Sequence, residues 1–184
     1  KDLAPIYFVT GNHELTSLAA TQYQELLALF QKYGVTDLDN DSVKLKKGGQ
    51  SITLYGRQYF SQYLTDSLPI ASDKDFDILL YHGSDNFKEI APYHYDLILS
   101  GHAHGGIVRL PIWGGIFGND GTFFPEYAGG EYTIGDATLI SSRGLGDASI
   151  PRFNNPPELV VIKLNPYSSV LSKSRMTPRI LIFP

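Results

Sequence analysis

Three short apolar runs in this chain are each followed at once by histidine and glycine. The runs are IYFVT, FDILLY and YDLILS, and the segments that follow are GNHE (residues 11–14), HG (82–83) and GHAHGG (101–106). Continuous apolar runs of this length are typical of strands buried on both faces. Because ligands bind outside the carboxyl ends of strands in open α/β sheets, we expect these segments to meet at one sheet edge.

The remaining segments predict α/β layers with a mixed sheet. A helix is expected from an N-cap at Thr16 or Ser17 up to Gly34, because apolar residues recur between them at helical spacing. The other expected elements are hairpins turning at Gly48–Gly49 and at Gly135–Asp136, a Gly- and aromatic-rich loop at 112–130, a strand at 158–164 and a tail at 166–184 that packs loosely or caps a sheet edge.

Composition excludes several classes of protein. The net charge is −4, without the basic excess of a nucleic-acid-binding protein, so no nucleic-acid partner is expected. Cysteine is absent, which excludes disulfides and thiolate catalysis and leaves His, Asn, Asp or Glu as metal ligands. No run of eighteen apolar residues occurs, so we expect the chain as given to be soluble, while its localisation is left open.

The distribution of the histidines predicts a metal site. His13, His82, His102 and His104 all follow the three predicted strands, whereas His94 precedes one and is interpreted as a structural residue. Residues two apart in an extended segment project to the same side, so His102 and His104 are expected to face one site. The surrounding glycines permit close approach of a ligand, and imidazole suits Zn, Mn and Fe.

These motifs together resemble the calcineurin-like metallophosphoesterases. GHAHGGIVRLP, SSRGLG and PPELVVIKL are more narrowly similar to the bacterial YkuE/YaeI-like phosphoesterase branch, and the resemblance extends from Pro5 to Leu164. It implies a four-layer α/β/β/α sandwich with mixed sheets. It also implies hydrolysis of a phosphomonoester or phosphodiester at a site with two divalent metal ions, of which Mn, Zn and Fe are candidates.

The resemblance assigns roles to individual residues. Asn12, His82 and His102 would bind one metal ion, and His104 would bind the other. His13 would be the general acid, or would stabilise the transition state beside the scissile phosphate.

Three further positions relate to the same resemblance. Arg143 would contact the substrate or form a structural salt bridge. Ile107 stands where relatives often carry glutamine, and Glu14 replaces a commoner aspartate, a change that we expect to be tolerated.

Two carboxylate motifs of the family, Asp-x-His and Gly-Asp-x-x-Asp, do not occur in this chain. The four matching ligands are neutral, and two dications about 3.5–4 Å apart repel strongly without carboxylates. We therefore expect residues 1–165 to be the C-terminal portion of the domain, with the missing N-terminal half as a partner and self-association through exposed apolar sheet. An alternative is a single-metal site of His82, His102 and His104.

Two classes of function remain open. The first is a metal-dependent phosphoester hydrolase acting on a small molecule or a lipid-linked substrate, in a protein that relatives suggest could be membrane-associated or exported. The aromatic residues of 112–130 would either wall the site, which suits a lipid-linked substrate, or pack the loop onto the sheet. The second class is a non-catalytic scaffold or binding module with a partial metal site.

Overall fold

The computed structural model describes residues 4–59, 64, 68–72, 75–118, 121–146 and 150–165, together with the backbone of 177–183. Its helices are α1 (Asn12–Thr16), α2 (Ala20–Tyr33), α3 (Phe87–Ile90) and the 3-10 helix η3 (Ala91–Tyr93). Its strands are β1 (Ile6–Phe8), β2 (Val35–Asp37), β3 (Ser42–Lys47), β4 (Gln50–Arg57), β5 (Phe76–Gly83), β6 (Leu97–Gly101), β7 (Val108–Leu110), β8 (Gly114–Phe117), β9 (Gly130–Ile134), β10 (Ala137–Ser141), β11 (Leu159–Asn165) and β12 (Thr177–Phe183).

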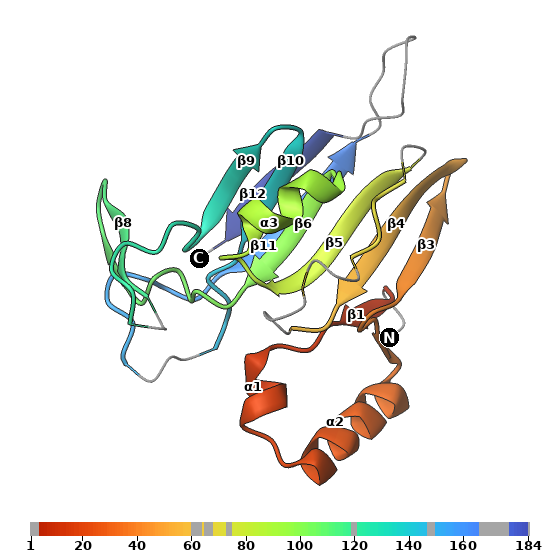
Figure 1. Cartoon of the computed structure of the whole chain (residues 1–184), viewed down its shortest axis with the longest axis horizontal. Helices are drawn as coiled ribbons and strands as arrows, with labels where there is room; N and C mark the ends of the chain where they lie inside the picture. Colours follow the sequence, from red (N-terminus) through yellow and green to blue (C-terminus); the bar gives the residue numbers. More distant parts are fainter. Residues whose placement is uncertain are drawn as a thin grey trace.

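A six-stranded mixed sheet forms the centre of the structure, in the order β3-β4-β5-β6-β10-β9 (Figure 1). The four inner strands run parallel, and the outer strands β3 and β9 are antiparallel to their neighbours. The carboxyl ends of β4, β5 and β6 therefore lie at one edge, beyond which α1 is placed in Figure 1. This arrangement confirms the predicted α/β fold with a mixed sheet and both predicted hairpins.

Helix α2 begins later than the sequence predicts. Its N-cap is Ala19, not Thr16 or Ser17, because the side chain of Gln22 accepts a hydrogen bond of 2.9 Å from the Ala19 N–H and so caps the first turn. The preceding residues form a separate short helix, α1. The end of α2 is as predicted, since Gly34 caps it in a left-handed conformation, with φ of 71°.

Three two-stranded sheets flank the central one. β1 pairs with β2 in parallel, β7 pairs with β8 and β11 pairs with β12. The loop expected at 112–130 thus contains a strand, β8. The sequence does not predict this strand because its glycines are typical of loops. The segment expected to form a tail contains β12, which pairs along the whole of β11.

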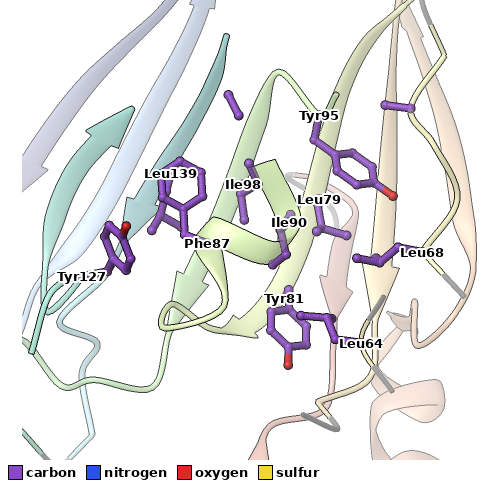
Figure 2. Packing of buried hydrophobic residues seen from close by; sticks show 12 residues of the cluster. Leu64, Leu68, Leu79, Tyr81, Phe87, Ile90, Tyr95, Ile98, Tyr127 and Leu139 are labelled. Carbon is purple, nitrogen blue, oxygen red and sulfur yellow. The ribbon is translucent and has the colours of Figure 1, made fainter. Parts of the chain in front are cut away.

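Both faces of the sheet are buried at β5 and β6, as their continuous apolar runs require. One face packs under α3 (Figure 2) in a cluster that contains Leu64, Leu68, Leu79, Tyr81, Phe87, Ile90, Tyr95, Ile98, Tyr127 and Leu139. The other face packs against β1 and β11 in a cluster around Leu38, Leu54, Phe76, Ile78, Leu97 and Ile140. No helix in the described part of the chain is both long and apolar enough to cross a membrane.

The side chain of an aspartate is buried at the start of β5, at the opposite end of the strand from His82. Asp77 is fully buried, and its N–H donates to Asp96 Oδ2 at 2.8 Å. Burial, with repulsion from Asp96, raises the pKa of Asp77 to about 6 from 3.8. At pH values between 3.8 and 6 the folded protein binds more protons than the unfolded chain. The protonated Asp77 therefore contributes to the free energy of unfolding at low pH, and this contribution is lost as the pH rises through 6.

We predict that Asp77→Asn removes this pH dependence. As the pH rises from about 4 to 7, the free energy of unfolding of the wild type should fall by about 1–3 kcal/mol more than that of the variant, because asparagine does not ionise. Urea denaturation at a series of pH values measures this. Asp136→Asn, at an exposed hairpin turn, is the control, and equal pH profiles for wild type and Asp77→Asn would contradict the prediction.

Candidate metal centre

Three of the predicted ligands come together at the carboxyl edge of the sheet. Asn12 opens α1, and its Oδ1 lies 3.0 Å from Nε2 of His82 near the end of β5, 70 residues further along the chain. The rings of His82 and His102 are 5.1 Å apart between centroids. The parallel strands β5 and β6 bring His82 and His102 side by side, as their apolar runs predict. Asn12 follows β1, which is partly exposed and pairs with β2 in a separate sheet, so the expectation of a strand buried on both faces is wrong for IYFVT.

Tyr59 is a neighbour of this group that sequence reasoning missed. Its ring lies 5.4 Å from that of His82 and 5.2 Å from that of His102, measured between centroids. It follows β4, whose carboxyl end lies at the same edge as those of β5 and β6. That position after a strand is the signal that could have found it, since no motif surrounds it.

His102 and His104 occupy a turn and not an extended segment. Both have a left-handed backbone, with φ of 66° and 49°, which corrects the expectation that they project to one side as alternate residues of a strand do. His102 contacts Tyr59, whereas Nδ1 of His104 lies 3.2 Å from Nη2 of Arg152. The two imidazoles therefore face different neighbours.

The segment before β11 holds this turn in place. Nδ2 of Asn155, a buried residue, donates to the carbonyl oxygens of His104 at 2.6 Å and of Ile107 at 3.3 Å. A Cβ at Gly105, which has φ of 75°, would lie 2.5 Å from Oδ1 of Asn155. The backbones of the two segments thus approach as closely as glycine allows. Neither Asn155 nor Arg152 belongs to a motif that predicts this role.

Arg143 forms an ion pair next to the same turn. Its Nε lies 2.5 Å from Oε2 of Glu158, and the backbone N–H of Arg143 donates to Oε1 of the same carboxylate at 2.7 Å. Glu158 is almost fully buried. The arginine thus makes the structural salt bridge considered above, and its contact with a substrate stays a prediction.

The two positions singled out above for their residue type, Ile107 and Glu14, have structural roles. The side chain of Ile107, a residue 1% exposed, belongs to the interior and makes no polar contact. Glu14 Oε2 accepts a hydrogen bond of 2.9 Å from the Gly11 N–H and closes the first turn of α1.

The remaining two histidines lie at opposite ends of the sheet. His13 is exposed on α1, next to Asn12, with Nδ1 3.3 Å from Oγ of Ser17. His94 caps η3 in a left-handed conformation before β6 begins, at the amino edge of the sheet and away from the other four.

Burial favours the neutral form of two of the imidazoles. It lowers the pKa of His82 to about 4, and the charges of His102, His104 and His13 add to the effect. Burial and then the neighbouring Arg152 also lower the pKa of His104. Neutral imidazole is the form that binds metal ions.

The sequence pattern of the family described as Calcineurin-like phosphoesterase matches residues 1–106, more than half of the chain. The chain belongs to the calcineurin-like phosphoesterase family. Members of this family use divalent metal ions to hydrolyse phosphoesters.

Individual relatives in the family agree with this assignment. The metallophosphoesterase YkuE of Bacillus subtilis is 38% identical over 94 residues, which cover 50% of this chain and 32% of YkuE. The phosphodiesterase YaeI of Escherichia coli is 24% identical over 164 residues, which cover 89% of this chain and 59% of YaeI. The chain therefore spans less than two thirds of the length of either relative.

A solved structure supports the fold alone. The sulfate thiohydrolase SoxB of Thermus thermophilus aligns with 97% of this chain and 32% of its own, with a TM-score of 0.56 and 17% sequence identity. The metallophosphoesterase-type fold predicted from the motifs is thereby confirmed.

The donor atoms present fit part of the family's metal site. Amide oxygen and imidazole nitrogen suit divalent transition metals, and Asn12, His82 and His102 already converge. Within the described residues, however, no three His, Asp or Glu side chains are arranged to hold an ion. His104 faces Arg152. The described residues thus offer neutral donor atoms to a metal ion without forming a complete site.

We predict that Glu158→Gln destabilises the fold by about 2–4 kcal/mol. The change leaves the guanidinium of Arg143, whose side chain is 18% exposed, without its buried counter-charge. The midpoint and slope of urea denaturation measure the loss.

Glu126→Gln provides a matched control. Glu126 pairs with Lys88 at 2.7 Å, but both side chains are about 60% exposed, and an exposed pair contributes little to stability. An equal shift of the urea midpoint in the two variants would show that burial of the Arg143–Glu158 pair is unimportant.

Proposed function

We propose that this chain supplies Asn12, His82, His102 and His104 to a two-metal centre that hydrolyses a phosphomonoester or phosphodiester, with His13 as the general acid. The observation that carries the proposal is the convergence of Asn12 and His82, 3.0 Å apart, with His102 at the carboxyl edge of the sheet. Membership of the calcineurin-like phosphoesterases and the name of YaeI support a phosphoester substrate.

The metal ions, for which Mn, Zn and Fe are candidates, would polarise the phosphoryl oxygens and activate the attacking water. The low pKa of His82 favours its neutral, ligating form at physiological pH. Tyr59 packs against two of the imidazoles and restricts their orientations. The carboxylates that complete such a centre would come from outside these 184 residues, in the missing half of the domain.

His13 is the residue proposed to move a proton. Its Nδ1 is next to Ser17 Oγ, so Nε2 is the nitrogen that would approach the substrate. In the proposed reaction water adds to phosphorus, the bond from phosphorus to the leaving oxygen breaks, and protonated His13 gives that oxygen its proton.

We predict that His82→Gln and His102→Gln each weaken Mn²⁺ binding at least about tenfold, since each removes an imidazole donor. Isothermal titration calorimetry of the full-length natural protein measures the affinity. His94→Gln is the control, because His94 lies at the opposite edge of the sheet. If the wild type bound no metal, or if the control weakened binding equally, the scaffold alternative would be favoured over this site.

The role of His13 predicts a dependence on the leaving group. In the full-length natural protein, His13→Ala should lower kcat about 10²–10⁴-fold for an alkyl phosphodiester, whose leaving oxygen needs a proton. The loss should be much smaller for bis(p-nitrophenyl) phosphate, whose leaving group departs as a stable anion. Equal losses with both substrates would indicate a role other than proton donation, and unchanged activity would exclude His13 from catalysis.

A further inference from the structure

A cavity of about 300 Å³ opens directly beside His102. Ser84 and Asp85, which follow β5, and Ala103 form part of its wall, and residues 118 and 122–127, which follow β8, form the rest. The volume is at the lower end of the range for small-molecule sites. A group that occupied this cavity would therefore lie next to any ligand bound at the imidazole of His102.

The wall after β8 is apolar and open to solvent. Phe123 and Phe124 line the cavity and are 72% and 56% exposed. The ring of Trp113, itself 70% exposed, lies 6.4 Å from that of Phe124 between centroids and lines a neighbouring cavity. The packing interpretation of this segment holds for Tyr127, which is buried against Phe87, whereas Phe123 and Phe124 are exposed.

The backbone of one of these residues has an unfavourable conformation. Phe124 has φ of 54°, although bulky residues rarely adopt the left-handed region. The Phe124 N–H donates to the Ile116 carbonyl oxygen at 2.8 Å and fixes this geometry. Such conformations are concentrated at ligand sites, where the surrounding structure maintains them.

The charges around the cavity disfavour a phosphate group in the part of it away from His102. Its ionisable lining residues include the carboxylates Asp85 and Glu126, and neither lysine nor arginine is found among the described residues that line it. Lys88 lies nearby but is paired with Glu126 at 2.7 Å. A phosphoester bound here would therefore place its anionic phosphate at the histidines and an uncharged portion in the cavity.

We propose that this cavity binds an apolar alkyl or aryl portion of the phosphoester substrate, with Phe123 and Phe124 as the residues that select it. The proposal rests on the proposed function, because it names the substrate class of the same site. It implies that affinity rises with the length of the apolar group until the cavity is filled.

The fluorescence of Trp113, the only tryptophan of the chain, should change when a ligand contacts Phe124, because the two rings lie 6.4 Å apart between centroids. We would titrate the chain with n-alkyl phosphonates from methyl to decyl and with n-alcohols of equal length, in the presence of Mn²⁺. Each added methylene should tighten binding about two- to fourfold until the affinity levels off. The phosphonates should bind more tightly than the alcohols of the same length.

Phe124→Asn tests the wall without straining the backbone, because asparagine tolerates the left-handed region better than phenylalanine. It should weaken binding of the longer phosphonates about tenfold and leave methyl phosphonate unaffected. Phe123→Ser, at a residue 72% exposed, provides a second variant should the first fail to fold. Tyr33→Asn, at the end of α2 and 62% exposed, is the matched control for loss of an exposed aromatic ring.

The outcomes separate this proposal from the proposed function. A chain-length dependence that phosphonates and alcohols share equally would support the cavity and count against a phosphate site. Affinity independent of chain length, or unchanged in both phenylalanine variants, would overturn the cavity. A Trp113 response to phosphatidylcholine vesicles alone would also overturn it, because the aromatic surface would then be a membrane contact.

Discussion

Burial of β5 and β6 on both faces determines where the polar residues of this chain can meet. Each strand lies between two apolar clusters, one under α3 and the other against β1 and β11, so neither strand can shift or reverse without exposing apolar surface. Because both strands run parallel, their histidines emerge at one edge. Asn12 reaches the same edge from β1. The convergence is a consequence of strand direction, and direct attraction between these side chains is not needed to produce it.

The turn that carries His102 and His104 depends on a different part of the chain. Its left-handed histidines and glycines are maintained by Asn155, which donates to two of its carbonyl oxygens, and by the close packing of Arg143 against Gly105. The ion pair with Glu158 fixes that arginine in turn. Two parts of the candidate centre are therefore supported independently. The sheet positions Asn12 and His82, and the segment that leads into β11 positions the turn with His102 and His104.

The elements that the sequence predicts well are those whose signal is local. The apolar runs locate β5 and β6, and paired glycines or Gly-Asp locate the hairpins. The start of α2 is missed because a side chain inside the helix, Gln22, caps Ala19 and takes the role expected of a threonine or serine. The left-handed histidines have no local signal. Arg152 and Asn155 contact the turn from 48 and 51 residues away, a relation that only the folded chain reveals.

The contact between Arg152 and His104 has a consequence for the protonation of the ring. A guanidinium can only donate, so Nδ1 of His104 is the acceptor at 3.2 Å and the hydrogen of the neutral imidazole lies on Nε2. The single lone pair of the ring is thus already occupied by a cation. Capture of a metal ion by His104 would be an exchange of one positive group for another: the metal ion takes the place of the arginine at Nδ1, or the ring changes tautomer and binds through Nε2, which also ends the hydrogen bond from the arginine. His82 is spared this competition, because its partner Asn12 brings no charge.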